Sequence, residues 1–220
     1  MSNHYARAVD GTARRERLAR SCLYLVLEAR LHGNDPAALL DAALRGGVDV
    51  VQLRDKELED EALVAAGEPF RAACDAHGAL FVLNDRPDLV EACKADGVHV
   101  GRSDTPVATA RLLVGRERLL GLSVSTVDEL AEVDGADYVG VTAFPTPTKD
   151  DAVAGGLELL RTASAALAVP WFAIGGIDAS NVAEVAAAGA PGVAVVRAIR
   201  DADDPETAAR MLRRALDRQE

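Results

Sequence analysis

The feature that most constrains the fold is a regular alternation of short apolar runs with longer helical segments. Eight runs rich in Val, Leu and Ile recur along the chain. The runs are Cys22–Leu27, Val48–Leu53, Leu80–Leu83, Gly97–Val100, Leu119–Leu122, Tyr138–Val141, Trp171–Ile174 and Gly192–Val196. Strands that are apolar on both faces and separated by amphipathic helices indicate a parallel sheet covered by helices. Eight such units in 220 residues predict an α/β fold of the (β/α)8, or TIM barrel, type.

Helix boundary signals flank many of the segments between the runs. Asp35, Ser125 and Asp178 stand where an N-cap residue is favoured, and Gly46 and Gly78 stand where helices end. The predicted helices are Pro36–Arg45, Glu59–His77, Thr126–Val133, Leu157–Ala168, Ala179–Ala188 and Pro205–Asp217, with a further helical segment at Pro87–Lys94.

The predicted barrel is a single domain over residues 21–220, preceded by an N-terminal extension, residues 1–20. Within this extension, Ala13–Arg20 is predicted to form a short helix across the bottom of the barrel, with its arginines on a solvated face. An open doubly wound sheet is the rival architecture, but no GxGxxG follows the first run.

Charge and cysteine content limit the classes of function. The net charge of −11, from 24 basic and 35 acidic residues, argues against a general nucleic-acid binder. Cys22, Cys74 and Cys93 include no CxxC spacing, which predicts reduced thiols in a cytoplasmic protein, with Cys22 and Cys74 in the core. No apolar run is long enough for a membrane span, and no apolar signal core opens the chain. The sequence leaves a homo-oligomer open.

Acidic residues follow two consecutive runs. Asn84 and Asp85 come directly after Leu80–Leu83, and Asp104 comes shortly after Gly97–Val100. If these strands are parallel neighbours, both carboxylates emerge at one mouth of the barrel. Carboxylate and amide oxygens suit a hard cation such as Mg²⁺. The alternative is that each aspartate is only an N-cap or turn residue.

Basic residues at the same mouth predict an anion site. Gln52, Arg54 and Lys56 alternate after the second run, so an extended chain would point them to one side. An arginine fork and a lysine point charge together suit a phosphate or diphosphate. Lys149 adds charge after the sixth run, and Ser123 adds a hydroxyl after the fifth.

Residues after the last three runs predict a second anion site. Thr146 and Thr148 alternate in a proline-rich loop, and Gly176 belongs to a glycine pair that opens a helix. Bare glycine amides near a helix start bind phosphate well. Val196 and Arg197 follow the last run, where phosphate sites of such barrels are found. Two phosphorylated substrates meeting at one Mg²⁺ is the inference from the two sites. His99, inside the fourth run, is predicted to be a core histidine.

The chain resembles thiamine phosphate synthase, also called thiamine-phosphate pyrophosphorylase, from Tyr24 to the last helix. The motifs that carry the resemblance are VQLRDK, LNDRPDL, ADGVHVGRSD, PTPTK and IGGI, in that order. The resemblance implies a (β/α)8 barrel that joins a hydroxymethylpyrimidine diphosphate to a thiazole phosphate, releasing diphosphate. It also implies a dissociative mechanism, in which diphosphate leaves first and the thiazole nitrogen captures a pyrimidine methylene cation.

The resemblance also implies a role for each motif residue. The pyrimidine diphosphate would be held by Gln52, Arg54, Lys56, Asn84, Ser123 and Lys149. The thiazole phosphate would be held by Thr146, Thr148, Gly176 and the backbone of Val196 and Arg197. Asp85 and Asp104 would hold Mg²⁺ on the diphosphate. Arg54, Lys56, Lys149 and Ser123 are the residues expected to act in catalysis.

Three positions depart from the family pattern. The run Val141–Phe144 lacks the usual Gly-Pro, Leu27-Glu28 replaces a Thr-Asp pair, and Arg197 replaces a small or hydroxyl residue. Two alternatives stay open: a thiazole tautomerase-like isomerase, and a non-catalytic barrel that binds thiamine intermediates. Asn84, Asp85 and Asp104 argue against the tautomerase.

Overall fold

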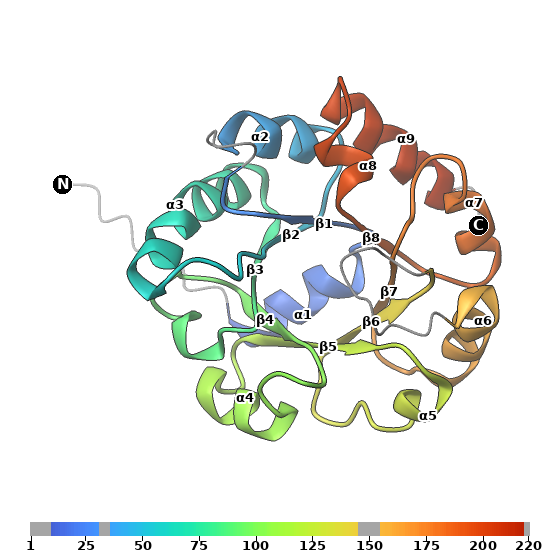
Figure 1. Cartoon of the computed structure of the whole chain (residues 1–220), viewed down its shortest axis with the longest axis horizontal. Helices are drawn as coiled ribbons and strands as arrows, with labels where there is room; N and C mark the ends of the chain where they lie inside the picture. Colours follow the sequence, from blue (N-terminus) through green and yellow to red (C-terminus); the bar gives the residue numbers. More distant parts are fainter. Residues whose placement is uncertain (1–9, 31–35, 145–154, 218–220) are drawn as a thin grey trace.

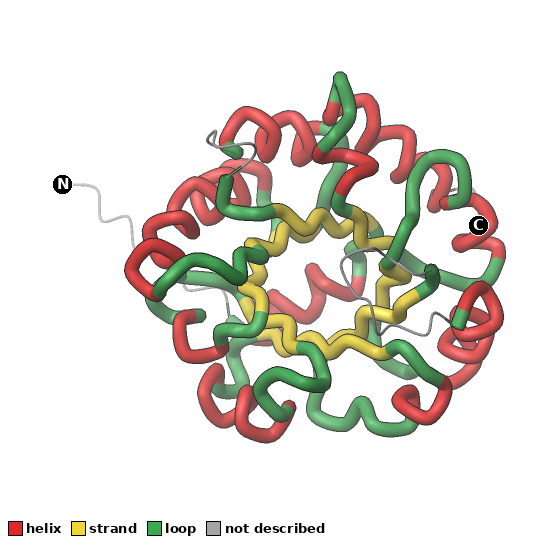
Figure 2. Tube along the Cα trace, in the orientation of Figure 1, coloured by secondary structure: helices red, strands yellow, loops and turns green. Residues whose placement is uncertain are grey.

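The computed structural model describes residues 10–30, 36–144 and 155–217, and eight parallel strands form its closed barrel (Figures 1 and 2). Each strand pairs with the next, and β8 pairs back on β1. The strands are β1 (Leu23–Leu27), β2 (Val50–Leu53), β3 (Leu80–Asn84), β4 (Gly97–Val100), β5 (Leu119–Val124), β6 (Tyr138–Thr142), β7 (Trp171–Ile174) and β8 (Val193–Val195). The predicted (β/α)8 barrel is confirmed, and the open doubly wound sheet is wrong.

The helices other than α1 form a ring outside the strands (Figure 2). The described helices are α1 (Gly11–Ala19), α2 (Ala37–Arg45), α3 (Asp60–His77), the 3₁₀ turn η1 (Pro87–Leu89), α4 (Val107–Val114), α5 (Val127–Leu130), α6 (Gly156–Ala166), α7 (Val182–Ala187), α8 (Arg197–Arg200) and α9 (Pro205–Asp217). None of them, not even the 18-residue α3, combines the length and apolar composition of a transmembrane segment.

Two predicted helix starts are displaced. The N-cap of α5 is Thr126 rather than Ser125, because Thr126 and Glu129 form a reciprocal capping box. Asp178 accepts hydrogen bonds from both the N–H and the hydroxyl of Ser180, so it closes a turn, and α7 begins only at Val182. Asp35 lies outside the described residues.

Two other segments differ from the prediction. Pro87–Lys94 is not a full helix: η1 covers three residues, and Lys94 has a left-handed φ of 52° that cannot continue a right-handed helix. Helix α4 is not among the helices predicted from the sequence. Pro106 before it and Gly115 after it, with φ of 71°, are boundary signals that the sequence does contain.

Side chains of the strands alternate between the barrel interior and the helices. The interior cluster consists of Leu18, Tyr24, Val26, Val50, Leu80, Val82, Leu119, Tyr138, Phe172 and Ala194. The larger cluster, from Leu23 and Leu25 on β1 to Leu216 on α9, lies between strands and helices. Because this outer layer is apolar at nearly every inward helix position, it holds the barrel together without restricting the residues at the strand ends.

Three aspartates at the amino ends of the strands, here called the basal aspartates, repeat one arrangement. Asp49, Asp96 and Asp137 immediately precede β2, β4 and β6. Each carboxylate accepts the backbone N–H of a residue in the preceding strand, at 3.1 Å from Leu23, 3.0 Å from Phe81 and 2.9 Å from Leu120. Arginines also bind each of them: Arg213 binds Asp49, Arg14 and Arg71 bind Asp96, and Arg15 and Arg111 bind Asp137.

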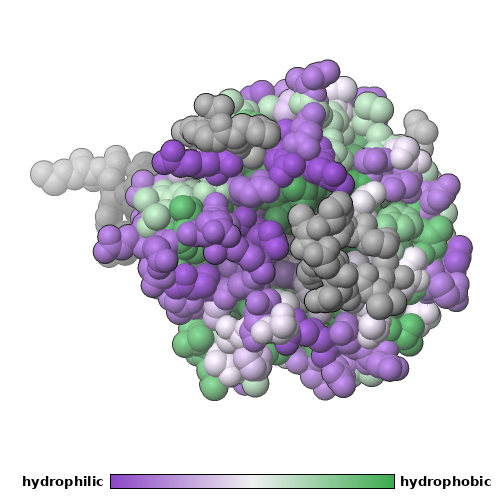
Figure 3. Space-filling model, viewed as in Figure 1, coloured by the Kyte–Doolittle hydropathy of each residue, from purple (hydrophilic) through white to green (hydrophobic). Residues whose placement is uncertain are grey.

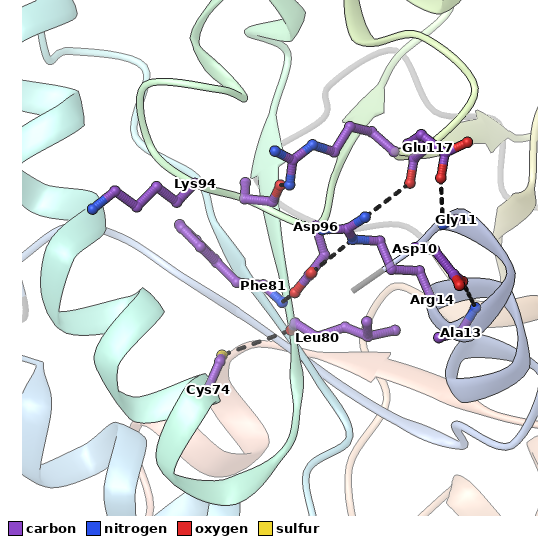
Figure 4. A network of polar contacts seen from close by, with 12 residues as sticks. Asp10, Gly11, Ala13, Arg14, Cys74, Leu80, Phe81, Lys94, Asp96 and Glu117 are labelled. Carbon is purple, nitrogen blue, oxygen red and sulfur yellow. Dashed lines mark hydrogen bonds and ion pairs between the residues drawn. The ribbon is translucent and has the colours of Figure 1, made fainter. Parts of the chain in front are cut away.

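Helix α1 lies across the amino end of the barrel, as predicted (Figure 1). Arg14 and Arg15 bind basal aspartates instead of forming a solvated face, which corrects that expectation for these two residues. Figure 4 shows Arg14 reaching from α1 to Asp96 and to the backbone of Glu117, with contacts of 2.9 and 3.1 Å. Arg15 binds Asp137 at 2.7 Å. Charge pairing explains why an arginine such as Arg14, which is 8% exposed, can be buried at the base.

Asp96 is the most buried of the basal aspartates and generates a stability prediction. Burial alone would raise the pKa of Asp96, but hydrogen bonds from Arg71, the Phe81 N–H and Arg14 lower it below its usual value of 3.8. Asp96→Ala removes the buried carboxylate that Arg14 and Arg71 share and should lower the free energy of unfolding by about 3–5 kcal/mol at pH 7. Urea unfolding measures the change.

Asp75→Ala is the matched control, because Asp75 also binds Arg71 but its side chain is 69% exposed, against 6% for Asp96. Asp75→Ala should lower the free energy of unfolding by less than about 1 kcal/mol. The contribution of Asp96 is present above pH 3.8 and is lost as the pH falls through the lowered folded-state pKa, so wild type and Asp96→Ala should converge in acid. Equal losses for both variants would contradict the role of the buried pairs.

Candidate active site

Closure of the barrel brings the carboxyl ends of all eight strands into one ring, here called the mouth. Hydrophilic residues gather on this face around the ends of β2, β3 and β4 (Figure 3). Asn84 is the last residue of β3, Asp85 follows it, and Asp104 follows β4. Since Asn84 and His99 are register partners on β3 and β4, the two acidic residues come from neighbouring strands. The predicted juxtaposition of the strand ends is therefore present.

Asp85 sits in an unusual backbone conformation. Its φ is +58°, in the left-handed region that few residues other than Gly, Asn and Asp adopt. Its N–H donates to the carbonyl of His99 at 2.8 Å, which fixes the turn at the end of β3. Asn84 Nδ2 donates to Asp85 Oδ2 at 2.5 Å, and Lys56 Nζ lies 3.8 Å from the same oxygen. The sequence predicted these groups at one mouth, and the structure brings Asn84, Asp85 and Lys56 into contact.

The electrostatics of Asp85 show that Asp104 is near. Burial raises the pKa of the Asp85 carboxyl, and Asp104 raises it further by charge repulsion and by a hydrogen bond to the protonated form. Lys56 and Asn84 act in the opposite direction without cancelling the increase. Asp104 Oδ2 also accepts the Gly101 N–H at 3.1 Å, which closes the loop after β4. Each aspartate therefore has a turn role, and the two carboxylates also share one space.

The donor set of this pair fits a hard divalent cation. Two carboxylates that repel each other would gain from a shared positive charge, and the amide of Asn84 stands beside them. Within the described ranges, no group of three or more His, Cys, Asp or Glu side chains is arranged to hold a metal. A cation held by the two carboxylates and the amide would therefore take its remaining ligands from substrate oxygens or water.

The residues of the β2 end that were predicted to bind an anion lie at two depths in the barrel. Gln52 lies within β2, is only 4% exposed and donates to the Tyr24 hydroxyl inside the barrel, so it does not share one solvent face with Lys56. Arg54 follows β2, and its N–H donates to the carbonyl of Leu27 at 2.8 Å. Its half-buried side chain makes no hydrogen bond or ion pair with a described residue. The guanidinium is thus available for a ligand.

Ser123 lies inside β5 rather than after it, because β5 extends to Val124. Its hydroxyl is 2.9 Å from His99 Nε2, and His99 is half-buried on β4. His99 is therefore not simply a core histidine: sequence reasoning missed its contact with a predicted site residue. The signal that could have found it is the period of two in GVHV, which puts Gly97 and His99 on one face of the strand.

Glycine and backbone groups make the other side of the mouth. Gly175 and Gly176 follow β7 with φ of 106° and 56°, and a Cβ on Gly175 would come within 2.4 Å of the Phe144 carbonyl. Val196 is the N-cap of α8 and Arg197 is its first residue, with an exposed side chain. Predicted site residues that lie outside the described residues are Thr146, Thr148 and Lys149.

The cysteines are not part of the mouth. All three are free thiols, with Cys74 and Cys93 buried and Cys22 half-buried. Burial raises the pKa of Cys74 to about 12, and burial with nearby Asp49 raises that of Cys22 to about 11. The predicted core position of Cys74 is confirmed, Cys22 packs at the edge of the core, and both are poor nucleophiles.

The fold and mouth define a (β/α)8 barrel with paired carboxylates beside a lysine on one side and a glycine turn on the other. The family model described as thiamine monophosphate synthase matches residues 23–199. The chain belongs to this family.

Individual relatives agree with this assignment. A thiamine-phosphate synthase of Thermobifida fusca is 47% identical, over 92% of this chain and 95% of that protein. One from Nostoc sp. is 44% identical over 94% of this chain, which spans 59% of the length of that relative. A solved structure, thiamine phosphate pyrophosphorylase from Pyrococcus furiosus, superposes with a TM-score of 0.83 at 32% identity, covering 93% of this chain and 98% of that one.

The raised pKa of Asp85 predicts an inverted pH effect on stability. The folded protein holds this proton more tightly than the unfolded chain, so wild-type stability falls as the pH rises from 3.8 through the raised pKa. An asparagine side chain at this position would tolerate the left-handed φ and cannot ionise. Asp85→Asn should therefore be more stable than wild type above that window and equal to it below pH 3.8. Urea unfolding across pH measures the difference.

Asp88→Asn is the control on the same loop. Hydrogen bonding from Arg86 lowers the pKa of Asp88, so this variant should lose stability at neutral pH instead. The same sign for both variants would argue that burial and Asp104 do not raise the pKa of Asp85 in the folded protein.

Proposed function

We propose that this chain is a transferase of thiamine biosynthesis that joins 4-amino-2-methyl-5-hydroxymethylpyrimidine diphosphate to a thiazole phosphate. The products are thiamine phosphate and diphosphate. The observation that carries the proposal is the contact of Asp85 with Asn84, Lys56 and Asp104 at the mouth of a barrel of this family. The nearly full-length match to the Thermobifida fusca thiamine-phosphate synthase supports the same reaction.

The diphosphate would bind on the side of the mouth that carries the cations. Arg54 offers a guanidinium with no ion pair to a described residue, and Lys56 offers an ammonium on an exposed chain. Both groups would stabilise negative charge as the bond from the pyrimidine methylene carbon to the diphosphate oxygen breaks. Lys149 is proposed to add to this charge. Gln52, Asn84 and Ser123 are proposed to hold the rest of the same substrate.

Asp85 and Asp104 would hold Mg²⁺ with Asn84 beside them. Bound there, Mg²⁺ supplies positive charge to the diphosphate leaving group. The repulsion that raises the pKa of Asp85 supports this assignment, because a cation shared by both carboxylates would remove it. The protein's own residues then orient the substrate and keep the leaving group in place.

The thiazole phosphate would bind on the opposite side. The left-handed turn at Gly175 and Gly176 and the start of α8 at Val196 and Arg197 leave backbone N–H groups near the mouth. Thr146 and Thr148 are proposed to complete this subsite. The thiazole nitrogen donates its lone pair to the methylene carbon, forming the new C–N bond after diphosphate has left with the electrons of the C–O bond. Holding both substrates in one mouth makes this capture effectively intramolecular.

A cytoplasmic location is proposed with this function. It is supported by the three free thiols, which suit a reducing compartment, and by a substrate class of small phosphorylated molecules.

A turnover assay with both substrates tests the proposal. Diphosphate release should require both substrates, and Arg54→Ala should lower turnover about a hundredfold because one charge contact to the leaving group is lost. Its melting temperature should stay near that of wild type, since Arg54 makes no ion pair with a described residue. Arg161→Ala, which removes an exposed arginine on α6, is the control and should keep full turnover.

The outcomes separate the alternatives. Isomerisation of a thiazole phosphate without diphosphate release would support the tautomerase reading, and binding without turnover would support a non-catalytic barrel. Unfolding of Arg54→Ala would make Arg54 a structural residue and remove it from the site.

The acidic pair generates a separate prediction for Mg²⁺. Asp85→Asn and Asp104→Asn should each need much more Mg²⁺ for turnover, while the double variant should be little worse than the poorer single. Two residues that act through one ion are not additive. Turnover titrated with Mg²⁺ for the four proteins measures this. Losses that multiply, or full wild-type turnover in a chelator, would show that the two carboxylates do not share a metal.

A further inference from the structure

We propose that His99, with Tyr138 and Tyr24, is a positioning residue that makes the hydroxyl of Ser123 a hydrogen-bond donor toward the ligand in the mouth. The identity of that ligand as the pyrimidine diphosphate rests on the proposed function; the polarity of the hydrogen bonds does not.

Five polar side chains form a continuous chain across the barrel interior, here called the interior chain. It runs from Gln52 on β2 to Tyr24 on β1, Tyr138 on β6, His99 on β4 and Ser123 on β5. The successive distances are 2.8 Å from Gln52 Nε2 to Tyr24 Oη, 3.0 Å between the two tyrosine hydroxyls, 3.3 Å from Tyr138 Oη to His99 Nδ1, and 2.9 Å from His99 Nε2 to Ser123 Oγ. Both ends of the chain are predicted ligand-binding residues.

The direction of every hydrogen bond in the interior chain follows from the donor at its first end, Gln52. Gln52 Nε2 can only donate, so Tyr24 Oη accepts from it and has one proton left to give. That proton goes to Tyr138 Oη, and the proton of Tyr138 goes to His99 Nδ1. This arrangement gives each hydroxyl proton an acceptor in a fully buried environment, where an unmade hydrogen bond is costly. Burial also raises the pKa of both phenols, so both keep their protons.

The tautomer of His99 is then determined. Because Nδ1 accepts from Tyr138, the ring proton is on Nε2, and Nε2–H donates to Ser123 Oγ. Ser123 accepts at one side, so its own hydroxyl proton is free to turn away from His99. The ligand atom that meets Ser123 must therefore be an acceptor, such as a ring nitrogen or a diphosphate oxygen.

The barrel backbone is shaped around these rings. A Cβ on Gly121 would come within 2.2 Å of Tyr138 Cζ and 2.4 Å of His99 Nδ1, and one on Gly140 would come within 3.3 Å of His99 Cε1. Gly121 pairs with both His99 and Tyr138 in register, so it lies directly between them. The two glycines keep the interior wide enough for a hydrogen-bonded pair of rings, which generic apolar packing of the barrel would not require.

A matched pair of substitutions tests the proposal. In His99→Gln the side-chain amide can reach the place of Nε2 and keep a donor to Ser123, whereas the shorter amide of His99→Asn reaches only the place of Nδ1. His99→Asn should lower kcat/KM for the pyrimidine diphosphate about tenfold, and His99→Gln should restore most of it. KM for the thiazole phosphate should stay the same in both. In a Ser123→Ala background the two variants should have equal kcat/KM.

Nitrogen NMR of the imidazole gives a readout that does not need turnover. Wild type should show a pyridine-like Nδ1 and a pyrrole-like Nε2 for His99, and Tyr138→Phe should weaken this preference. His99→Asn assigns the signals, and His77→Asn, on the exposed end of α3, is the control that should leave them unchanged.

Each experimental outcome either supports or contradicts the proposed role of His99. An Nδ1–H tautomer or an imidazolium at neutral pH would overturn the proposed polarity. Equal activity of His99→Gln and His99→Asn with Ser123 present would reduce His99 to a space-filling residue. If wild type does not release diphosphate, the proposed function fails, and the NMR result still decides the polarity of the interior chain.

Discussion

The pairing of β8 with β1 is the constraint on which the rest of the structure depends. It leaves no strand edge unpaired and makes the carboxyl ends of eight separate strands neighbours. Lys56, Asp85 and Asp104 are brought together by the direct pairing of β2, β3 and β4, and closure adds the ends of β7 and β8 to the same ring. Closure also gives the barrel a narrow interior, so every inward side chain must fit those of the other strands.

The two ends of the barrel satisfy charge in different ways. At the amino end, each basal aspartate is bound by arginine and by a backbone N–H, so burial is compensated by fixed partners. At the mouth, Asp85 faces Asp104, and the ammonium group of Lys56, on an exposed side chain, is 3.8 Å from Asp85. Paired charge at the base stabilises the fold, whereas the charge at the mouth is what the proposed Mg²⁺ and diphosphate would balance.

Between these two ends, part of the barrel interior is filled by polar rather than apolar side chains. Near the base the interior is filled by Leu18, Leu80, Leu119 and Phe172. Closer to the mouth it contains Gln52, His99 and Ser123, which Tyr24 and Tyr138 connect through hydrogen bonds. A buried polar network that is fully satisfied specifies one arrangement of its members. The end groups that would meet a ligand, Gln52 and Ser123, are therefore set by partners on three other strands, β1, β6 and β4.

The sequence by itself determined the class of fold and predicted which end of the barrel carries the candidate site. The eight apolar runs fixed the strands to within a few residues, since a parallel strand buried on both faces must be apolar throughout. Asn84, Asp85 and Asp104 could be predicted as site residues because they follow such runs, and the strand ends of a barrel meet at one mouth. Helix starts were less certain, as at Thr126, because adjacent hydroxyl residues can each serve as a cap.

Only the tertiary structure decided which groups pair. Arg14 and Arg15 of α1 appeared solvent-facing in sequence, but Asp96 and Asp137, which lie 82 and 122 residues further along the chain, bind them at the base. Likewise His99 and Ser123 are 24 residues apart, and no local pattern links them until register places Gly121 between His99 and Tyr138. Local periodicity is encoded in neighbouring residues, whereas these contacts depend on the register of a closed sheet, which is set by the packing of the whole barrel.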